Sequence, residues 1–384
     1  MKKTKIIHVI TRMDWGGSPD IVRQIFTSLS QESFDIYLIF GLTKNSTRQT
    51  KDFLRELKDK SIYLPSLRRE MNPLMDLMAF FELCRIFYRL KPDIITTHTA
   101  KAGALGRLAA FCLGLKKVIH FPHGNIFYGY FNKIISLFIL KAEQLLAIIT
   151  SRIIVFTESE KAILLKLGLA KEEKIMIIPA GIDPLPYPDK EWLKKERLSL
   201  GIQEEDFVVG MVSRLEPVKG ADYFILAALQ VLEKRNDVCF LVVGEGSLRA
   251  KLELWVANHK KRDKIIFTGW REDAGSLMGL MDILVQPSLN EAIGRVLLQA
   301  QGLGIAVIAT QAGGIPDIVC NGVTGILIPP AETAKLTEAI VSLLSDTAKR
   351  EAFAKKGGEL VKDRFSMEVM AKGIRQLYKE EVYK

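Results

Sequence analysis

Disulfide and metal-ligand patterns are missing from this sequence. Its 384 residues include only four cysteines, and no two of them have the spacing of a metal site. Each lies in an apolar run, so we expect four small buried side chains in a reducing compartment: Cys84, Cys112, Cys239 and Cys320. The Asp-x-Asp pattern, a pair of carboxylates suited to a divalent cation, does not occur either.

The sequence also lacks an apolar run that is long enough to cross a membrane. The longest candidate, Ile134–Ile149, is shorter than the roughly 20 residues that a spanning helix needs, and Lys141 and Glu143 interrupt it. Near the N-terminus, the short run Ile6–Ile10 predicts a first β-strand and not a signal peptide. We therefore expect a cytoplasmic protein, at most peripheral at the inner face of the plasma membrane.

Positive charge is concentrated in the first half of the chain. Residues 1–185 contain 27 Lys and Arg against 17 Asp and Glu, residues 186–384 contain 27 of each, and the whole chain carries +10. Such a surface can attract nucleic acid, an anionic lipid or a phosphate-bearing ligand, or it can simply keep the protein soluble. The charge alone leaves these alternatives open.

Short apolar runs alternate with amphipathic stretches, such as Pro73–Leu90, along the whole chain. This alternation predicts an α/β fold with parallel sheets that are covered by helices on both faces. The expected strands are Ile6–Ile10, Asp35–Phe40, Ile62–Leu64, Asp93–Thr97, Val118–Phe121, Ile153–Phe156, Ile175–Ile178, Val208–Val212, Phe240–Val243, Ile265–Thr268, Ile283–Gln286, Val307–Ala309 and Ile326–Ile328.

A segment with four prolines and a charge run, PAGIDPLPYPDKEWLKKE, interrupts the alternation in the middle of the chain. It predicts a linker between two Rossmann-like domains, residues 1–185 and 186–365, followed by a C-terminal helix over 366–384 that can cross back to the first domain. Ligands of such sheets bind beyond the carboxyl ends of the strands. We therefore expect a cleft between the two domains.

The most informative motif begins at Gln286: QPSLNEAIGRVLLQAQGLGIAVIATQAGG. A strand ends, a loop carries Glu291, and Gly294 opens a helix whose first backbone N–H groups, at Gly294, Arg295 and Val296, form a site for a diphosphate. A carboxylate beside that site can accept hydrogen bonds from sugar hydroxyls. Upstream, VSRLEPVKG places Arg214 and Lys219 after another strand, where both cations can reach a diphosphate or, alternatively, face solvent.

Together these motifs resemble the family 4 glycosyltransferases of bacterial surface-polysaccharide pathways. The family has two glutamates separated by seven residues, of which the first binds donor-sugar hydroxyls and the second grips the ribose. Glu291 matches the first glutamate, but Gln299 stands at the second, and an amide there weakens the grip by roughly 1 kcal/mol. Arg214 and Lys219 match the cations that stabilise the β-phosphate of the leaving nucleotide.

Weaker matches extend the resemblance through the second half. LVVGEGSLR, with Gly244 and Gly246, is a strand, glycine loop and helix that resembles an incomplete dinucleotide fingerprint. FTGWREDAGSL matches the segment that holds the base, mostly through the backbone around Trp270 and Arg271. Trp270 can equally be a packing residue.

The first half contributes a glycine loop and histidines at strand ends. Gly16 and Gly17 follow the first strand, where the family's backbone approaches the donor phosphate and the acceptor, although an ordinary turn has the same pattern. His123 matches the family histidine near the donor sugar. His98 and Lys101 are candidates for binding the acceptor, although Lys101 can alternatively cap the start of a helix. By strand alternation, His120 points to the opposite face of the sheet.

An aromatic loop follows His123. Residues 125–131 include Phe127, Tyr128, Tyr130 and Phe131, which either close on the acceptor, touch a lipid or pack into the core.

The resemblance implies a two-domain GT-B fold and a retaining transferase that needs neither a metal nor another cofactor. It would move a hexose or N-acetylhexosamine from a nucleotide diphosphate sugar, expected to be a UDP-sugar, to a sugar or lipid-linked acceptor. The basic first half then suggests an anionic membrane surface as a partner, and we expect no nucleic acid. The alternatives are a sugar-nucleotide epimerase of the same fold and a non-catalytic nucleotide-sugar-binding protein.

Overall fold

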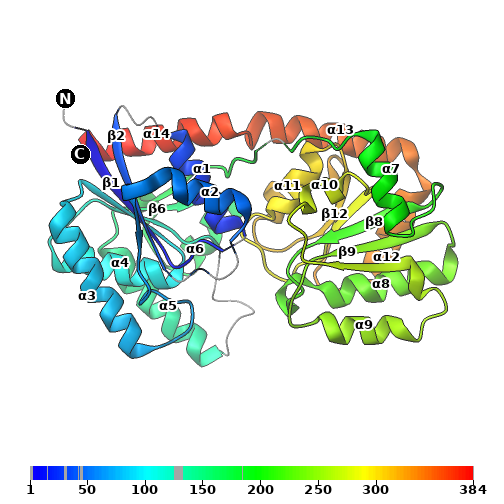
Figure 1. The fold of residues 1–384 in the computed structure, drawn as a ribbon, viewed down its shortest axis with the longest axis horizontal. Coiled ribbons are helices and arrows are strands. Elements are labelled where there is room, and N and C mark those ends of the chain that lie inside the picture. Colours follow the sequence, from blue (N-terminus) through cyan, green and yellow to red (C-terminus); the bar gives the residue numbers. More distant parts are fainter. Residues whose placement is uncertain are drawn as a thin grey trace. The chain divides into compact units, whose positions relative to one another are not determined.

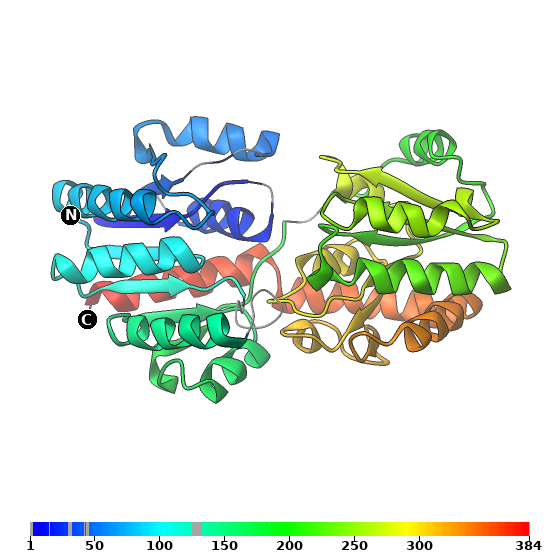
Figure 2. The same ribbon diagram turned by 90° about the horizontal axis from the view of Figure 1, so that it is seen from below.

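The computed structural model describes residues 3–14, 16–29, 33–41, 43, 46–124, 133–183 and 185–383. The chain divides into two compact units, residues Met1–Gly181 with Met367–Lys384, and residues Ile182–Ser366. Each unit is one parallel sheet with helices on both faces (Figures 1 and 2). The C-terminal helix thus belongs to the first unit, although it follows the second unit in the chain.

The first unit has a seven-stranded parallel sheet in the order β3-β2-β1-β4-β5-β6-β7. Helices α3, α4 and α5 lie on one face, and α1 and α14 lie on the other (Figure 1). The strands are β1 (Thr4–Ile10), β2 (Phe34–Phe40), β3 (Ser61–Tyr63), β4 (Ile94–His98), β5 (Val118–Phe121), β6 (Arg152–Val155) and β7 (Ile175–Ile177). The helices are α1 (Gly17–Ser28), α2 (Arg48–Leu57), α3 (Pro73–Leu90), α4 (Ala100–Cys112), α5 (Lys133–Ile148), α6 (Glu158–Lys166) and α14 (Met367–Tyr383).

The second unit has a six-stranded parallel sheet in the order β10-β9-β8-β11-β12-β13. Its strands are β8 (Phe207–Val212), β9 (Val238–Val243), β10 (Ile265–Gly269), β11 (Ile283–Gln286), β12 (Ala306–Thr310) and β13 (Gly325–Ile328). Its helices are α7 (Lys190–Ser199), α8 (Ala221–Lys234), α9 (Arg249–Ala257), α10 (Ala274–Met278), α11 (Arg295–Gly302), α12 (Thr333–Ser345) and α13 (Thr347–Arg364).

The strands form because their apolar runs are buried on both faces of the sheets. Every residue of β9 and of β12 is buried, as expected for central parallel strands covered by helices. All thirteen expected strands are present, and the bounds of Val118–Phe121 and Ile283–Gln286 are as predicted. The α/β prediction is therefore confirmed at the level of individual strands.

Two expectations were wrong in detail. The charge run in the expected linker forms helix α7, because the Asp189 side chain caps its start by accepting a hydrogen bond of 2.7 Å from the Trp192 amide. Of the four cysteines expected to be buried, Cys112 and Cys320 are exposed, and only Cys239 is fully buried. No helix among the described residues is long and apolar enough to cross a membrane.

Each sheet has one point at which the strand order reverses. In the first unit β1 lies between β2 and β4, and in the second unit β8 lies between β9 and β11. The loops that follow the two strands at such a point diverge and leave a crevice, where ligands of open α/β sheets bind. The fold therefore places two candidate regions, one after β1 and β4 and the other after β8 and β11.

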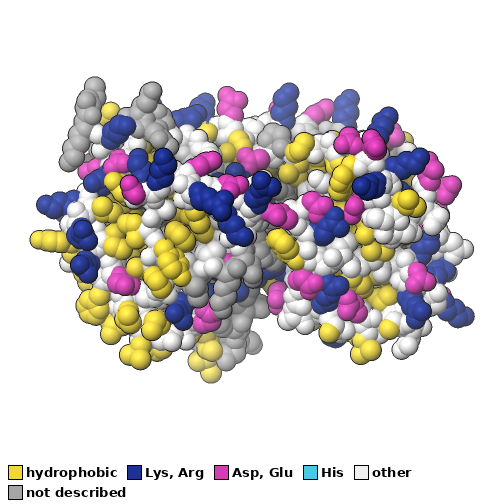
Figure 3. Space-filling view, in the orientation of Figure 1, with side chains coloured by type: hydrophobic (Ala, Val, Ile, Leu, Met, Phe, Trp, Pro, Cys, Tyr) yellow, Lys and Arg dark blue, Asp and Glu magenta, His cyan; other side chains and the backbone are white. Residues whose placement is uncertain are grey.

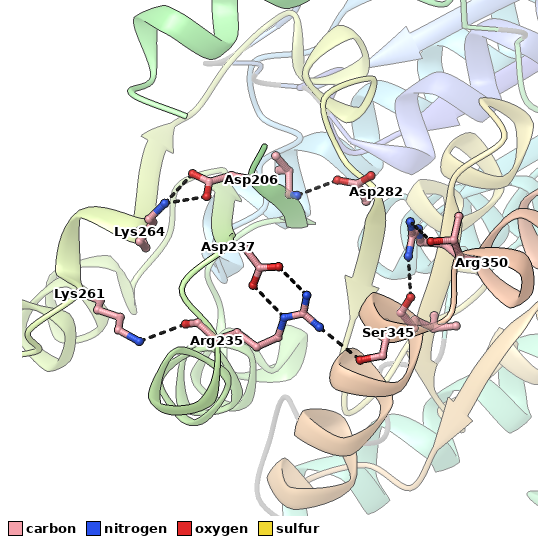
Figure 4. Close-up of polar contacts among 11 residues, drawn as sticks. Asp206, Arg235, Asp237, Lys261, Lys264, Asp282, Ser345 and Arg350 are labelled. Carbon is pink, nitrogen blue, oxygen red and sulfur yellow. Dashed lines mark hydrogen bonds and ion pairs between the residues drawn. The ribbon is translucent and has the colours of Figure 1, made fainter. Parts of the chain in front are cut away.

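The opposite, amino-terminal edge of the second sheet is held together by polar contacts (Figure 4). Asp206, just before β8, accepts hydrogen bonds of 2.8 and 2.6 Å from the Lys264 ammonium, and Asp282, just before β11, accepts one of 2.8 Å from the Val208 amide. Arg235 binds Asp237 through both of its carboxylate oxygens. These charges are used within the fold, which leaves the carboxyl edge as the candidate site.

Candidate functional site

In the second unit, the loops that follow β8 and β11 are joined by backbone contacts. The Leu289 amide donates a hydrogen bond of 2.8 Å to the Val218 carbonyl oxygen. Gly220 has φ +69°, and a Cβ atom there would lie 2.0 Å from the Pro287 carbonyl oxygen, so only glycine fits. This close approach brings Lys219 and Glu291 together, although they are 72 residues apart in the sequence.

Three donors converge on one oxygen atom of Glu291. Lys219, Gln286 and Ser288 all donate to Oε1, with distances of 2.5 Å from Gln286 Nε2 and 3.1 Å from Ser288 Oγ. Among the described residues, no side chain donates to the second oxygen, Oε2. The carboxylate is therefore fixed by one oxygen and presents the other as an acceptor for a ligand hydroxyl.

A glycine turn shapes the backbone on which Glu291 sits. The Gly314 amide donates a hydrogen bond of 3.2 Å to the Glu291 carbonyl oxygen. A Cβ atom on Gly313, which has φ +55°, would lie 1.7 Å from that same oxygen. Gly313 and Gly314 thus hold the loop that carries the carboxylate.

The start of α11 and Arg214 lie at the same edge of the sheet. Gly294 adopts a left-handed conformation before α11, and no side-chain hydrogen bond caps this helix end. Arg214 follows β8 and is half-buried, and within the described ranges its guanidinium has no hydrogen bond or ion pair. The first turn of α11, with Arg295 and Val296, supplies backbone N–H donors suited to an anion.

Gln299 lies on α11, eight positions after Glu291. It is half-buried, and its side-chain amide has no hydrogen bond to any residue that the structure describes. The amide is therefore available to one acceptor and one donor of a ligand.

The glycine loop after β9 supports the loop that carries Arg214. Cβ atoms on Gly244 and Gly246 would lie 1.9 Å from the Ser213 carbonyl oxygen and 2.5 Å from the Leu215 carbonyl oxygen. The Leu215 amide also donates a hydrogen bond of 2.9 Å to Glu245. These two glycines thus allow the loop after β9 to pack against the loop that carries Arg214.

Trp270 and Arg271 lie in different surroundings. The Trp270 side chain is 42% exposed, so it is not a core residue. Arg271 binds both oxygens of Asp273 at 2.6 Å and Glu196 at 3.0 Å, and the hydrogen bond to Asp273 is the main reason why its pKa is raised. Because its guanidinium is held within the unit, a contact of Arg271 with a base would come from its backbone.

In the first unit, a chain of hydrogen-bonded side chains crosses the sheet at β1 and β4. Thr96 Oγ1 lies 2.8 Å from the Tyr378 hydroxyl, which lies 3.2 Å from Nε2 of His8. Nδ1 of His8 lies 2.9 Å from Nε2 of His98, and Nδ1 of His98 lies 2.9 Å from Nε2 of His123. These hydrogen bonds thus connect helix α14 with His123, two positions after the end of β5.

The inner histidines of this chain are buried and neutral. Burial lowers the pKa of His8 to about 3, and burial together with the neighbouring His123, His8 and His120 lowers the pKa of His98 well below its usual value. The expectation that His98 contacts the acceptor is wrong in this structure, because the ring is fully buried and both nitrogen atoms face other histidines. His98 is placed to orient His123 instead.

His123 is held in a tight backbone turn. Its φ is +57° and that of Gly124 is +118°, so the chain reverses directly after β5 and the ring lies against His98. His120 belongs to β5, and its Nδ1 atom lies 2.9 Å from the Thr97 hydroxyl. It is not one of the hydrogen-bonded side chains that link Tyr378 to His123. Residues 125–131, with the aromatic loop, lie outside the described residues.

The remaining candidates of the first unit are Gly16, Gly17 and Lys101. Gly16 has φ +141° and is exposed at the start of α1, whose first residue is Gly17, next to the reversal point of the sheet. Lys101 is bound by both carboxylate oxygens of Asp76, at 2.7 and 3.0 Å. Its ammonium ties α4 to α3, so the expected role in binding an acceptor phosphate is not supported.

Sequence reasoning missed four residues that hold the two candidate regions. Gln286 and Ser288 were seen only as the end of a strand, and the close spacing of polar side chains before Glu291 was the available signal. His8 stands on β1 beside Thr96 of β4, and a histidine in an otherwise apolar strand was the signal for it. No sequence signal pointed to Tyr378, because it lies 282 residues after Thr96 in the sequence. No cluster of three potential metal ligands occurs among the residues that are described.

Comparisons with known proteins match both units. The model for "Glycosyltransferase Family 4" matches residues 15–184, and that for "Glycosyl transferases group 1" matches residues 194–360. The chain is 31% identical over 350 residues to an Escherichia coli UDP-Gal:alpha-D-GlcNAc-diphosphoundecaprenol alpha-1,3-galactosyltransferase, covering 90% of this chain and 89% of that protein. It is 25% identical over 388 residues to the Staphylococcus aureus capsular polysaccharide biosynthesis glycosyltransferase CapM, covering 98% and 97%.

A solved structure shares the fold. The crystal structure of HepE from Anabaena in complex with UDP and glucose matches with a TM-score of 0.82 and 22% identity, over 98% of this chain and 100% of that one. The predicted GT-B fold is thereby confirmed. Both family models and the similarity over nearly the full length of the E. coli enzyme lead to one assignment. The chain is a glycosyltransferase that belongs to the GT-B family 4 glycosyltransferases.

Proposed function

We propose that the enzyme transfers a hexose or N-acetylhexosamine from a UDP-sugar to a lipid-linked glycan in surface polysaccharide biosynthesis, with retention of the anomeric configuration. The observation that carries the donor half is Glu291, whose Oε1 is fixed by three donors while Oε2 stays available to a sugar hydroxyl. The names of the E. coli relative and of the HepE complex support a uridine nucleotide, and the E. coli name supports a diphosphate-linked lipid acceptor.

The second unit supplies the groups that a departing diphosphate requires. When the bond between the sugar and the β-phosphate breaks, its electron pair stays on the phosphate oxygen, and fixed positive groups stabilise that charge. Arg214 has no competing partner among the described residues, and Lys219 keeps two of its three N–H donors after binding Glu291. The first turn of α11 adds backbone donors, and Gln299 is placed to bind the ribose hydroxyls.

Retention follows if the acceptor attacks from the side on which the diphosphate leaves. The acceptor oxygen then bonds to the anomeric carbon while its proton moves to an oxygen of the leaving phosphate, so the protein needs no carboxylate base. In this proposal His123 positions the donor sugar and the buried histidines orient His123. Arg214, Lys219 and α11 neutralise the diphosphate, and we propose that no metal or other cofactor takes part.

Product analysis tests this function. The enzyme would be incubated with UDP-galactose, UDP-glucose, UDP-N-acetylglucosamine or GDP-mannose and with polyprenyl-diphosphate-linked N-acetylglucosamine. We expect mass spectrometry to detect one added sugar from a UDP donor, NMR to show an α-linkage, and EDTA to leave the rate unchanged. Release of UDP without a glycosylated lipid would contradict the proposed acceptor, and a β-linked product would contradict retention.

A further inference from the structure

Helix α3 exposes an apolar face. The exposed apolar side chains that follow Leu74 lie three, four, seven and fourteen positions after it, so they form one stripe along the helix. They are between 50% and 74% exposed, whereas the solvent face of a helix on a soluble domain is normally polar. This α3 stripe consists of Leu74, Leu77, Met78, Phe81 and Tyr88.

Helix α5 repeats the same pattern. Its stripe begins at Ile134 and has further apolar residues three, four, eleven and fourteen positions later. These side chains are between 57% and 82% exposed. Each stripe contains one exposed basic residue, Arg85 in α3 and Lys141 in α5. The α5 stripe consists of Ile134, Leu137, Phe138, Leu145 and Ile148.

The two stripes belong to one surface. Helix α4 lies between α3 and α5, packs against both, and exposes Leu108 and Phe111. Figure 3 shows apolar side chains gathered over these helices of the first unit. We call the exposed side chains of α3, α4 and α5 the α3–α5 surface. An apolar patch of this kind marks an interaction site.

The acidic residues of these helices are all used internally. Asp76 binds Lys101, Glu82 accepts a hydrogen bond from Ser66, and Glu143 binds the buried Arg107 at 2.8 and 2.7 Å. The exposed basic residues have no acidic partner within the described part of the chain, and Lys141 donates a hydrogen bond to the neutral side chain of Gln144. They are Arg85, Arg89 and Lys141. The α3–α5 surface is therefore apolar and cationic.

The position of the basic residues distinguishes a membrane from a protein partner. Arg85 and Lys141 lie inside the apolar stripes, not at their rims, and burying an unpaired cation in the centre of a protein interface is costly. At a bilayer the long side chains can reach the lipid phosphates while their stems and the neighbouring apolar residues lie at the acyl boundary.

We propose that the α3–α5 surface docks the enzyme on an anionic lipid bilayer. The apolar stripes insert at the boundary between headgroups and acyl chains, and Arg85, Arg89 and Lys141 bind lipid phosphates. The inference is independent of the donor, since it rests on the surface of the first unit alone. Docking in this way would hold the enzyme at the same bilayer that contains a lipid-linked acceptor.

Vesicle sedimentation without donor or acceptor tests the proposal, so its outcome is separate from that of the transfer reaction. We expect wild-type protein to bind vesicles with 30% phosphatidylglycerol more tightly than pure phosphatidylcholine vesicles. The variant Arg85→Gln/Arg89→Gln/Lys141→Gln should lose affinity for the anionic vesicles by on the order of a hundredfold, about fivefold for each charge. Phe81→Ser/Phe138→Ser should abolish the binding that persists at high salt.

Matched controls lie on the second unit. Leu198→Ser/Leu254→Ser removes two apolar side chains that are also more than 60% exposed, at 81% and 69%, and Lys355→Gln/Lys356→Gln removes exposed charges on α13. Both controls should bind vesicles like wild type, and an unchanged midpoint of thermal unfolding in every variant would verify folding. If the surface variants sediment like the controls, the proposal is wrong. If Phe81→Ser/Phe138→Ser converts a dimer to a monomer by light scattering and leaves vesicle binding unchanged, the surface binds a second copy instead.

Discussion

His98 bridges two other histidines, with its Nε2 atom 2.9 Å from His8 and its Nδ1 atom 2.9 Å from His123. A neutral imidazole has one N–H donor and one acceptor nitrogen, so the bond on one side of His98 fixes the tautomer that faces the other side. The orientation and tautomer of His123 are therefore coupled to buried groups of β1 and α14.

The first prediction concerns His98 as a positioning residue. His98→Ala removes both hydrogen bonds, so we expect kcat to fall by roughly tenfold to a hundredfold while the KM for the donor changes little, the range that loss of general positioning contributes. Steady-state kinetics of transfer check this. His259→Gln, which alters a histidine on the second unit that bonds Glu233, should behave like wild type. An unchanged kcat for His98→Ala would mean that the role of His123 does not depend on its hydrogen bond with His98.

A second prediction links the buried histidines to stability at low pH. Burial lowers the pKa of His8 from 6.5 to about 3 and also lowers the pKa values of His98 and His120. Below about pH 6.5 the unfolded chain takes up protons that the native state excludes, so stability is full above that pH and decreases as the pH falls, by up to ~1.4 kcal/mol per pH unit for each such group.

Calorimetric unfolding between pH 7.5 and pH 5 measures this dependence. We expect the midpoint temperature for unfolding of the first unit to decrease as the pH is lowered. The decrease should be less steep in His8→Gln, which has one titrating group fewer in its unfolded state. Equal slopes for wild type and His8→Gln would show that His8 is not neutral in the native protein. The variant His259→Gln again provides the control on the second unit.

The third prediction addresses the pair Lys219 and Glu291. In the proposed mechanism, Glu291→Ala and Lys219→Ala each remove a fixed group at the breaking bond, so turnover should fall at least a hundredfold, corresponding to about 3 kcal/mol. Because the two side chains share a hydrogen bond, the double variant should lose less than the product of the two single effects. Wild-type turnover in either single variant would remove that residue from the mechanism, and fully multiplicative effects would mean that the two residues act separately.

The fourth prediction concerns the amide on α11. Gln299→Glu introduces a charged acceptor for ribose hydroxyls, so UDP should bind more tightly, by roughly 1 kcal/mol or about fivefold. Isothermal titration calorimetry measures the affinity. Gln203→Glu adds the same charge at an exposed position before β8 and should leave UDP binding unchanged. Weaker binding by Gln299→Glu would indicate a pocket that is adapted to the amide.

The thirteen strands could be predicted from the sequence because each is a short apolar run followed by a turn. Parallel strands also place their loops at one edge, so Arg214, Lys219 and Glu291 could be expected on the same side of one sheet. The convergence of three donors on Glu291 Oε1 could not, since it depends on Gly220 and Gly313 fitting against carbonyl oxygens.

The histidine chain was predicted only in part, for a physical reason. Alternation along a strand says that His98 and His120 point to opposite faces, but it does not say what packs on each face. Helix α14 brings the Tyr378 hydroxyl to His8 from the far end of the sequence, and Asp76 of α3 takes up Lys101. Both contacts depend on helix packing, which local patterns do not encode.

The return of α14 to the first unit affects how the protein is made. The first unit begins at the N-terminus, but the ribosome must complete the whole second unit before the residues that finish the first one emerge. A nascent chain that ends before Tyr378 therefore leaves His8 and Thr96 without their hydroxyl partner. Translation therefore completes the second unit before the last element of the first unit becomes available.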